Sequence, residues 1–239
     1  MTSPPLPGTI LRLDIAESSR GRVARSAHLD ATLKSTLDKV LADVPDKYAA
    51  VSWFRRIDGD SATLALPATV PKPWIAADLI RLLKMALRQV NQHLNDDGRL
   101  RLRAAVDHGD LIVGDQNIAG VPVHVTARLI DSEELRDELR RSAQDDLALI
   151  VSDRFYHEVV GEEAQDLDAR TFYQTDFEIK GNAVRGWIRR GAATCEAGVP
   201  GNQPVPHHAE SRSTYSAHSE HGTAIAHLEQ SGQTITNHF

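Results

Sequence analysis

Apolar residues recur at the spacing of an α-helix in four stretches of the chain. The first begins at Leu29 and stops at Pro45, because proline cannot continue a helix. The second opens with Pro71 and Pro73, which suit a helix start, and ends before Gly98. Together these stripes predict helices over residues 29–44, 71–96, 121–142 and 154–160.

Other stretches alternate apolar and polar residues, which is the period of a strand with one buried face. The pair Asp58-Gly59 between two such stretches predicts a tight hairpin, because glycine adopts the positive φ that the turn needs. A second turn is predicted at His108-Gly109, and residues 17–27 have the composition of a polar loop. The expected strands cover residues 9–14, 50–58, 61–66, 100–106, 111–113, 147–151, 171–180 and 183–190.

The order of these elements predicts an α+β fold. Strands and helices follow one another as β-α-β-β-α-β-β-α-β-α-β-β, which is typical of a ferredoxin-like βαββαβ core sheet. We expect the helices to pack on one face of that sheet. A chain of 239 residues can bury one sizeable core, which we assign to residues 9–190, after a disordered, proline-rich start at residues 1–8.

The composition changes after residue 190. Residues 191–239 contain one Arg, no Lys and six of the eleven His, and they lack the apolar content for a core, which predicts a flexible tail. Within it, residues 222–238 are β-prone, free of proline and uncharged apart from Glu229, a pattern typical of cross-β segments. They resemble the short amyloid signalling motifs at the ends of some bacterial immune proteins. A disordered tail is the alternative interpretation.

Charge and cysteine content exclude several classes of function. The net charge of −6 argues against general nucleic-acid binding, which usually needs a basic surface, and favours small-molecule chemistry. The single cysteine, Cys195, cannot form an internal disulfide. Residues 1–8 have no basic region followed by an apolar one, so we expect no signal peptide, and no apolar run approaches the ~20 residues that span a bilayer. We therefore expect a cytoplasmic protein without a membrane span.

Two carboxylates lie where strands meet loops. Asp14 closes the first strand, and Asp60 follows the glycine of the first hairpin. Hard divalent cations prefer oxygen ligands, and Mg²⁺ in phosphoryl-transfer sites is often held by one or two carboxylates together with substrate phosphates. The pair is therefore a candidate metal site. From position alone, a helix cap and a turn residue are the alternatives.

Two further motifs join this pair. Residues 101–110 read Arg-Leu-Arg-Ala-Ala-Val-Asp-His-Gly-Asp, and residues 120–129 read Gly-Val-Pro-Val-His-Val-Thr-Ala-Arg-Leu. With Asp14, Asp60 and the element order, they resemble the class III nucleotidyl cyclase catalytic domain over residues 9–190. The resemblance implies conversion of a nucleoside triphosphate to a 3′,5′-cyclic monophosphate and pyrophosphate.

The resemblance also implies roles for individual residues. Asp14, Asp60 and the backbone carbonyl of Ile15 match the family's ligands for two divalent cations, Mn²⁺ or Mg²⁺. Arg128 matches the arginine that stabilises charge on the α-phosphate in the transition state, and Lys180 matches a lysine that contacts phosphates. A solvated helix residue and a turn lysine are the respective alternatives.

Three residues depart from the family pattern. His124 replaces the asparagine that orients the ribose, which leaves a degenerate site open. Arg56 takes the place of the lysine that reads adenine, and Asn117 that of its aspartate partner. Arginine offers only donors, whereas the asparagine amide offers a donor group and an acceptor, so the pair suits uracil. Cytosine is matched less well, because its amine needs an acceptor that only Asn117 supplies.

Residues 148–156 resemble actinobacterial cyclase-like proteins of conflict systems, a neighbourhood that includes the Pycsar pyrimidine cyclases. This implies a producer of cyclic UMP or cyclic CMP in antiviral defence, acting on a separate effector protein. Family cyclases complete their sites across a head-to-tail homodimer. By that analogy, Asp14, Asp60 and Arg56 of one subunit face Asn117, His124 and Arg128 of the other. Two alternatives stay open: a purine cyclase, and a degenerate cyclase fold that senses a nucleotide or recruits a partner through its tail.

Overall fold

The computed structural model describes residues 4–18, 23–161, 167–179, 182–191, 216–220, 223–230 and 233–238. The chain divides into two compact units, Met1–Gly198 and Val199–Phe239. Each unit is described by itself. No helix in the described ranges has both the length and the apolar character needed to cross a bilayer.

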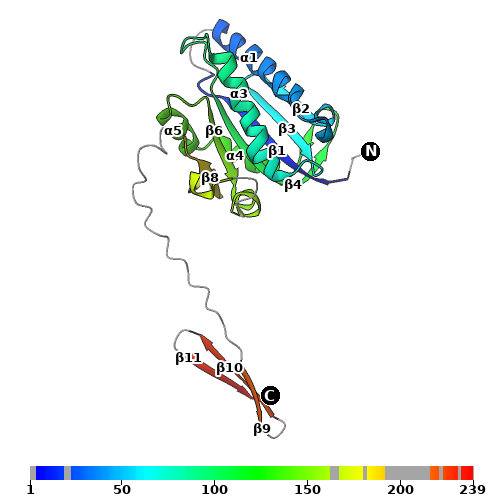
Figure 1. The fold of residues 1–239 in the computed structure, drawn as a ribbon, viewed down its shortest axis with the longest axis vertical. Helices are drawn as coiled ribbons and strands as arrows, with labels where there is room; N and C mark the ends of the chain where they lie inside the picture. The colour runs from blue at the N-terminus through cyan, green and yellow to red at the C-terminus, as the bar shows by residue number, and fades with distance from the viewer. Residues whose placement is uncertain are drawn as a thin grey trace. The chain divides into compact units, whose positions relative to one another are not determined.

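The first unit is built on a mixed sheet of eight strands (Figure 1). Seven strands follow one another across the sheet in the order β2-β3-β1-β4-β6-β8-β7, and the eighth, β5, pairs with β4. Only β4 and β6 are parallel, and the other pairs are antiparallel. Their bounds are β1 Leu6–Ile15, β2 Phe54–Asp58, β3 Ser61–Pro67, β4 Leu102–Val113, β5 Ile118–Ala119, β6 Leu147–Ser152, β7 Phe172–Ile179 and β8 Asn182–Arg189.

Helices cover both faces of this sheet. On one face, α1 (Val23–Ala42) and α3 (Ile80–Asn91) pack over the larger core, to which β4 contributes Ala104. On the other face, α4 (Val121–Ile130) and α5 (Glu133–Arg141) pack over a smaller core that includes Ala105. Successive strand residues point to opposite faces, so these neighbours belong to different cores. The predicted α+β class is confirmed, but the expectation that the helices lie on one face is wrong.

Short helical segments complete the first unit. A three-residue helix, α2 (Lys72–Trp74), and a π-helical turn, η3 (Ile75–Leu79), lead into α3. After β6, α6 (Asp153–Phe155) continues into a second π-helical turn, η4 (Tyr156–Val160). In the described ranges, 3-10 turns also occur at Asp46–Tyr48, Ala50–Ser52 and Ala169–Thr171.

One predicted turn and one predicted helix differ from the structure. No turn occurs at His108-Gly109, because β4 stays paired with β1 from Leu102 to Leu111, and Gly109 lies opposite Gly8. The helix predicted over residues 121–142 is broken at Ser132, whose backbone is extended and whose hydroxyl donates to the carbonyl of Leu129. Long-range pairing in the first case and a local side-chain bond in the second override the pattern.

The boundaries of two further elements also differ. Helix α1 begins at Val23, inside the stretch predicted as a loop, and β2 begins at Phe54, after the 3-10 turns, rather than at residue 50. The first hairpin forms where expected, with Asp58 paired to Ser61 and Gly59 at φ 58°.

The second unit contains a three-stranded antiparallel sheet. Its strands are β9 (Ser216–Glu220), β10 (Thr223–Gln230) and β11 (Gln233–His238), with β10 in the centre. Ile225 pairs with His238 and Gln230 with Gln233. The β-prone segment at residues 222–238 coincides with the last two strands.

Candidate active site

Asp14 and Asp60 come together because β1 and β3 are neighbours. Asp14 lies near the end of β1, opposite Ser61, and Asp60 is in the turn immediately before β3. The backbone N–H of Ile15 donates to the carbonyl of Asp60 at 2.9 Å, which fixes the turn against the strand. The backbone therefore brings Asp14 and Asp60 next to one another.

Arg103 joins this pair from the other side of β1. It lies opposite Asp14 in the β1–β4 register and forms an ion pair with its carboxylate. The two side chains are only 11% and 20% exposed, respectively, so water screens the pair weakly. Arg103 also donates to the carbonyl of Ile130, at the end of α4, at 3.3 Å.

Sequence reasoning did not single out Arg103. Arg101 and Arg103 entered it as polar positions of an alternating strand and as part of the motif over residues 101–110, with no role of their own. The available signal was their charge, because an arginine that faces into a fold beside a carboxylate-bearing strand needs an anionic partner. The register of β1 against β4 is needed to identify that partner as Asp14.

The surroundings of Asp14 disfavour its negative charge. Burial raises the pKa of its carboxyl above 3.8; Arg103 opposes this shift, while Asp60 and Asp131 add to it. A carboxylate in such a position gains from a bound cation, which restores the interactions lost with water. The net effect therefore favours a proton or a metal ion at Asp14.

The oxygen donors fit a hard divalent cation. Arg103 contacts Oδ2 of Asp14, and the hydroxyl of Ser18 donates to Oδ2 of Asp60. Across the described residues, no cluster of three or more His, Cys, Asp or Glu side chains can hold a metal ion. Two carboxylates and a backbone carbonyl such as that of Ile15 are nevertheless typical of sites where substrate phosphates complete the coordination of Mg²⁺. These residues fit a nucleotide-bound cation.

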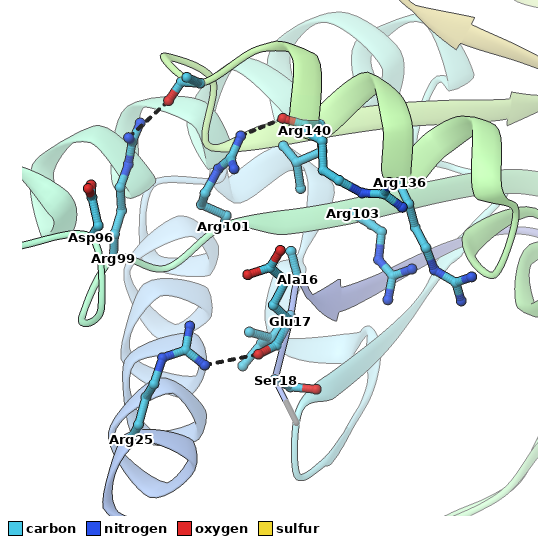
Figure 2. Close-up of a pocket in the computed structure, with 13 residues that line it drawn as sticks. Ala16, Glu17, Ser18, Arg25, Asp96, Arg99, Arg101, Arg103, Arg136 and Arg140 are labelled. Atoms are coloured by element: carbon cyan, nitrogen blue, oxygen red, sulfur yellow. Dashed lines mark hydrogen bonds between the residues drawn. The ribbon is translucent and has the colours of Figure 1, made fainter. Parts of the chain in front are cut away.

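A cavity of about 720 Å³ is lined by Ser18 and Arg103, the hydrogen-bond partners of Asp60 and Asp14 (Figure 2). Residues of the β1 end, Ile15 to Ser18, form one side of it, and α5 forms another. Its charged lining consists of Arg25, Arg99, Arg101, Arg103, Arg136, Arg140, Glu17 and Asp96. Six arginines against two carboxylates make it a site for anions.

His124 and Arg128 lie elsewhere. They are one turn apart on α4, with His124 exposed and Arg128 half-buried, and neither lines the cavity. Within the described ranges, no hydrogen bond or ion pair joins either of them to Asp14 or Asp60. A single chain therefore does not assemble all the residues that the resemblance assigns to one site.

The base-reading residues are also apart. Arg56 forms an ion pair with Asp58 at 2.6 Å and is 38% exposed, while Asn117 is exposed in the turn before β5. The Asn117 carbonyl accepts from the backbone N–H of Gly114 at 2.8 Å, which closes that turn. Within the described part of the chain, no hydrogen bond joins Arg56 to Asn117. Lys180 lies outside the described residues.

Comparisons with known proteins identify the fold. No protein-family model matches the chain, and no curated protein matches it. Among solved structures, the guanylyl cyclase Cya2 matches with 17% identity and a TM-score of 0.52, over 80% of this chain and 95% of that one. A bacterial light-regulated adenylyl cyclase matches with 15% identity and a TM-score of 0.50, over 78% and 91%.

A non-canonical dimeric guanylyl cyclase domain of the RhoGC fusion protein from the aquatic fungus Blastocladiella emersonii matches with 14% identity and a TM-score of 0.50, over 79% and 99% of the two chains. At such identities the likeness shows a shared fold. The chain has the fold of a cyclase catalytic domain.

Proposed function

We propose that this protein is a nucleotide cyclase that converts a pyrimidine nucleoside triphosphate, UTP in preference to CTP, to its 3′,5′-cyclic monophosphate and pyrophosphate. The observation that carries the proposal is that Asp14, which lies beside Asp60, forms an ion pair with Arg103, and that Arg103 lines a cavity rich in arginine. Such a cavity suits a triphosphate, and the carboxylate pair suits the metal ions that accompany one. The cyclase activities in the names of the similar structures agree with this chemistry.

The reaction balances within the nucleotide. The ribose 3′-oxygen forms a bond to the α-phosphorus, the bond from that phosphorus to the bridging oxygen breaks, the hydroxyl proton passes to solvent water, and pyrophosphate departs. Asp14 and Asp60 would hold divalent cations, whose charge would lower the pKa of the hydroxyl and stabilise the pyrophosphate. Arg103, fixed by Ile130 and Asp14, contributes a permanent positive charge beside the phosphates.

We assign the remaining groups to a second copy of the chain. His124 and Arg128 share a helix and lack partners at the carboxylate pair, so they are available to a site on another subunit. In a head-to-tail homodimer, Arg128 would stabilise charge on the α-phosphate and His124 would donate to the ribose. Lys180 is a further phosphate contact in this proposal.

The choice of base rests on Arg56 and Asn117. Arg56 has an exposed partner, Asp58, and an exposed ion pair is weak enough to exchange for a base carbonyl. Asn117 is exposed and its backbone is held in a closed turn, so its amide is positioned to read a base edge. Donors from both residues and an acceptor from Asn117 match uracil.

The biological role is proposed on the resemblance alone. A cyclic pyrimidine nucleotide would act as a second messenger in antiviral defence and would switch on a separate effector protein.

The test is product formation from ATP, GTP, CTP and UTP with Mn²⁺, with the product identified by mass. We expect cyclic UMP or cyclic CMP from the wild-type protein and none from Asp60→Ala, because that variant loses half of the carboxylate pair. Arg81→Ala is the matched control, since Arg81 pairs only with Asp78 on the surface of the η3–α3 segment among the described residues. Comparable initial rates with ATP and UTP would contradict the pyrimidine assignment.

A mixing experiment addresses the dimer. Asp60→Ala and Arg128→Ala should each be inactive alone, and a mixture should recover part of the activity, because one hybrid site keeps both residues. Failure of the mixture to recover activity, with both variants folded and dimeric, would contradict the head-to-tail arrangement.

A second candidate function is a signalling module that binds a nucleotide without turnover and recruits a partner through its C-terminal sheet. The observation that favours it is the three-stranded sheet of the second unit, whose outer strands β9 and β11 can pair with another chain. Nucleotide binding by a folded dimer, with no product from any of the four nucleotides, would select this function.

A further inference from the structure

The arginine-lined cavity is larger than the surroundings of Arg103 alone. One of its walls is α5, which contributes Arg136 and Arg140. Both side chains extend from α5 along the side of the cavity that holds Arg103 (Figure 2). Neither residue belongs to the metal pair, to α4 or to the base-reading positions.

A chain of contacts connects α5 with Asp14. Arg103 pairs with Asp14 and donates to the carbonyl of Ile130 at 3.3 Å. The next residue, Asp131, lies 3.8 Å from the guanidinium of Arg136 and also acts on the charge of Asp14. The wall formed by α5 is therefore adjacent to the carboxylate pair, on the side of Arg103.

The inner wall of the cavity carries the positive charge of Arg101, which the carboxylates of Asp146, Glu17 and Asp145 offset in part. Among the described residues, Arg101 donates to backbone carbonyls, including that of Ser142 at 2.9 Å, and to no acid. Burial, followed by the neighbouring Arg99, lowers the pKa of Arg101, although arginine remains charged. A buried cation held by neutral dipoles attracts an anion to the space in front of it.

The acidic partners of the α5 arginines are exposed. Arg136 pairs with Asp131 and Glu133, and Arg140 pairs with Glu133 and Asp137. These carboxylates are 40% to 67% exposed, so their pairs are screened by water and contribute little to stability. Each arginine can therefore turn to a stronger, multiply charged acceptor in the cavity.

We propose that Arg136 and Arg140 of α5, together with Arg103, form a diphosphate subsite that binds the β- and γ-phosphates of the substrate and holds pyrophosphate after cleavage. Planar guanidinium groups bind phosphate oxygens in pairs, which suits them to this task. The identity of the nucleotide rests on the function proposed above, whereas the binding of a diphosphate does not.

The direct test is calorimetric binding of inorganic pyrophosphate to the full chain without divalent cations, so that the affinity reports the arginines. We expect Arg136→Gln and Arg140→Gln each to weaken binding about tenfold, the loss typical of one charge-assisted hydrogen bond. Arg88→Gln in α3 is the matched control, because Arg88 does not line this cavity, and its affinity should equal that of the wild type. Unchanged thermal midpoints establish that the variants are folded.

Turnover assays separate the two proposals. Both α5 variants should raise the KM for the nucleotide and weaken inhibition by pyrophosphate. Pyrophosphate binding that the variants weaken, in a protein that makes no cyclic product, would refute the proposed function and leave the subsite standing. The subsite is refuted if the wild type does not bind pyrophosphate, or if the α5 variants match the control in affinity, KM and inhibition.

Discussion

Two opposing effects act on the pKa of the Asp14 carboxyl. It is held against Arg103, which favours its ionised form, but burial and the neighbouring Asp60 and Asp131 outweigh that pair and raise its pKa. With a raised pKa in the folded state, the stability contributed by protonated Asp14 is present below about pH 3.8 and is lost as the pH rises through the folded value. At neutral pH, a bound cation can neutralise the charge of Asp14, as the proton does at low pH.

We therefore predict that Mn²⁺ stabilises the protein in a pH-dependent manner. At a hundredfold excess over its Kd, a metal ion that binds only the folded state adds about 2.7 kcal/mol to the free energy of unfolding. The gain should shrink as the pH falls towards the raised pKa of Asp14, because protons compete with the metal for its carboxylate. Thermal unfolding with and without Mn²⁺ measures it. If Mn²⁺ stabilises Asp14→Asn equally, or if the stabilisation does not depend on pH, the metal binds elsewhere.

At the scale of elements, the turn between β5 and α4 depends on one glycine. Gly120 has φ 143°, a conformation that side chains rarely adopt, and a Cβ atom there would lie 2.4 Å from the carbonyl oxygen of Asp110. This residue precedes Val121 and Pro122, which begin α4. The position of His124 and Arg128 therefore depends on a backbone that only glycine allows.

Gly120→Ala should lower the free energy of unfolding by about 1–3 kcal/mol, because it adds backbone strain and a clash with β4. Gly114→Ala is the matched control: its Cβ would lie 3.5 Å from the carbonyl of Asn117, an ordinary contact, and should change stability by less than about 0.5 kcal/mol. Urea unfolding measures both. Equal effects of the two substitutions would contradict this account.

At the scale of the whole molecule, the chain divides into two compact units, and the second begins at Val199. Among the residues whose burial the structure describes, the three hydrophobic clusters of the first unit lie before residue 189. The last bond recorded from the first unit's end is from the N–H of Gly191 to Glu138 at 2.7 Å. A chain that ends at Gly198, the boundary between the units, keeps all of these contacts.

Removing residues 199–239 should therefore leave the thermal midpoint and the rate of cyclisation unchanged, while any self-association through β9 to β11 is lost. Light scattering of the full and truncated proteins at matched concentration measures self-association. Thermal unfolding and the turnover assay measure the other two quantities. A loss of turnover on truncation would show that the second unit takes part in catalysis or in forming the active dimer.

Much of the fold was predictable because its signals are local. Apolar periodicity predicted the main strands and helices, and Asp58-Gly59 predicted the first hairpin. Local signals failed at His108-Gly109, where pairing with β1 keeps β4 straight through a turn-like dipeptide, and at Ser132, where one hydroxyl ends a helix that the apolar stripe continues.

The sequence by itself determined the order of elements and placed Asp14 and Asp60 at strand ends, since periodicity and turn chemistry act over a few residues. Only the tertiary structure decided that Arg103 faces Asp14, that helices cover both faces of the sheet, and that α5 closes a cavity rich in arginine. Those features depend on strand register and on packing between residues up to 89 positions apart, as for Asp14 and Arg103, which no local pattern encodes.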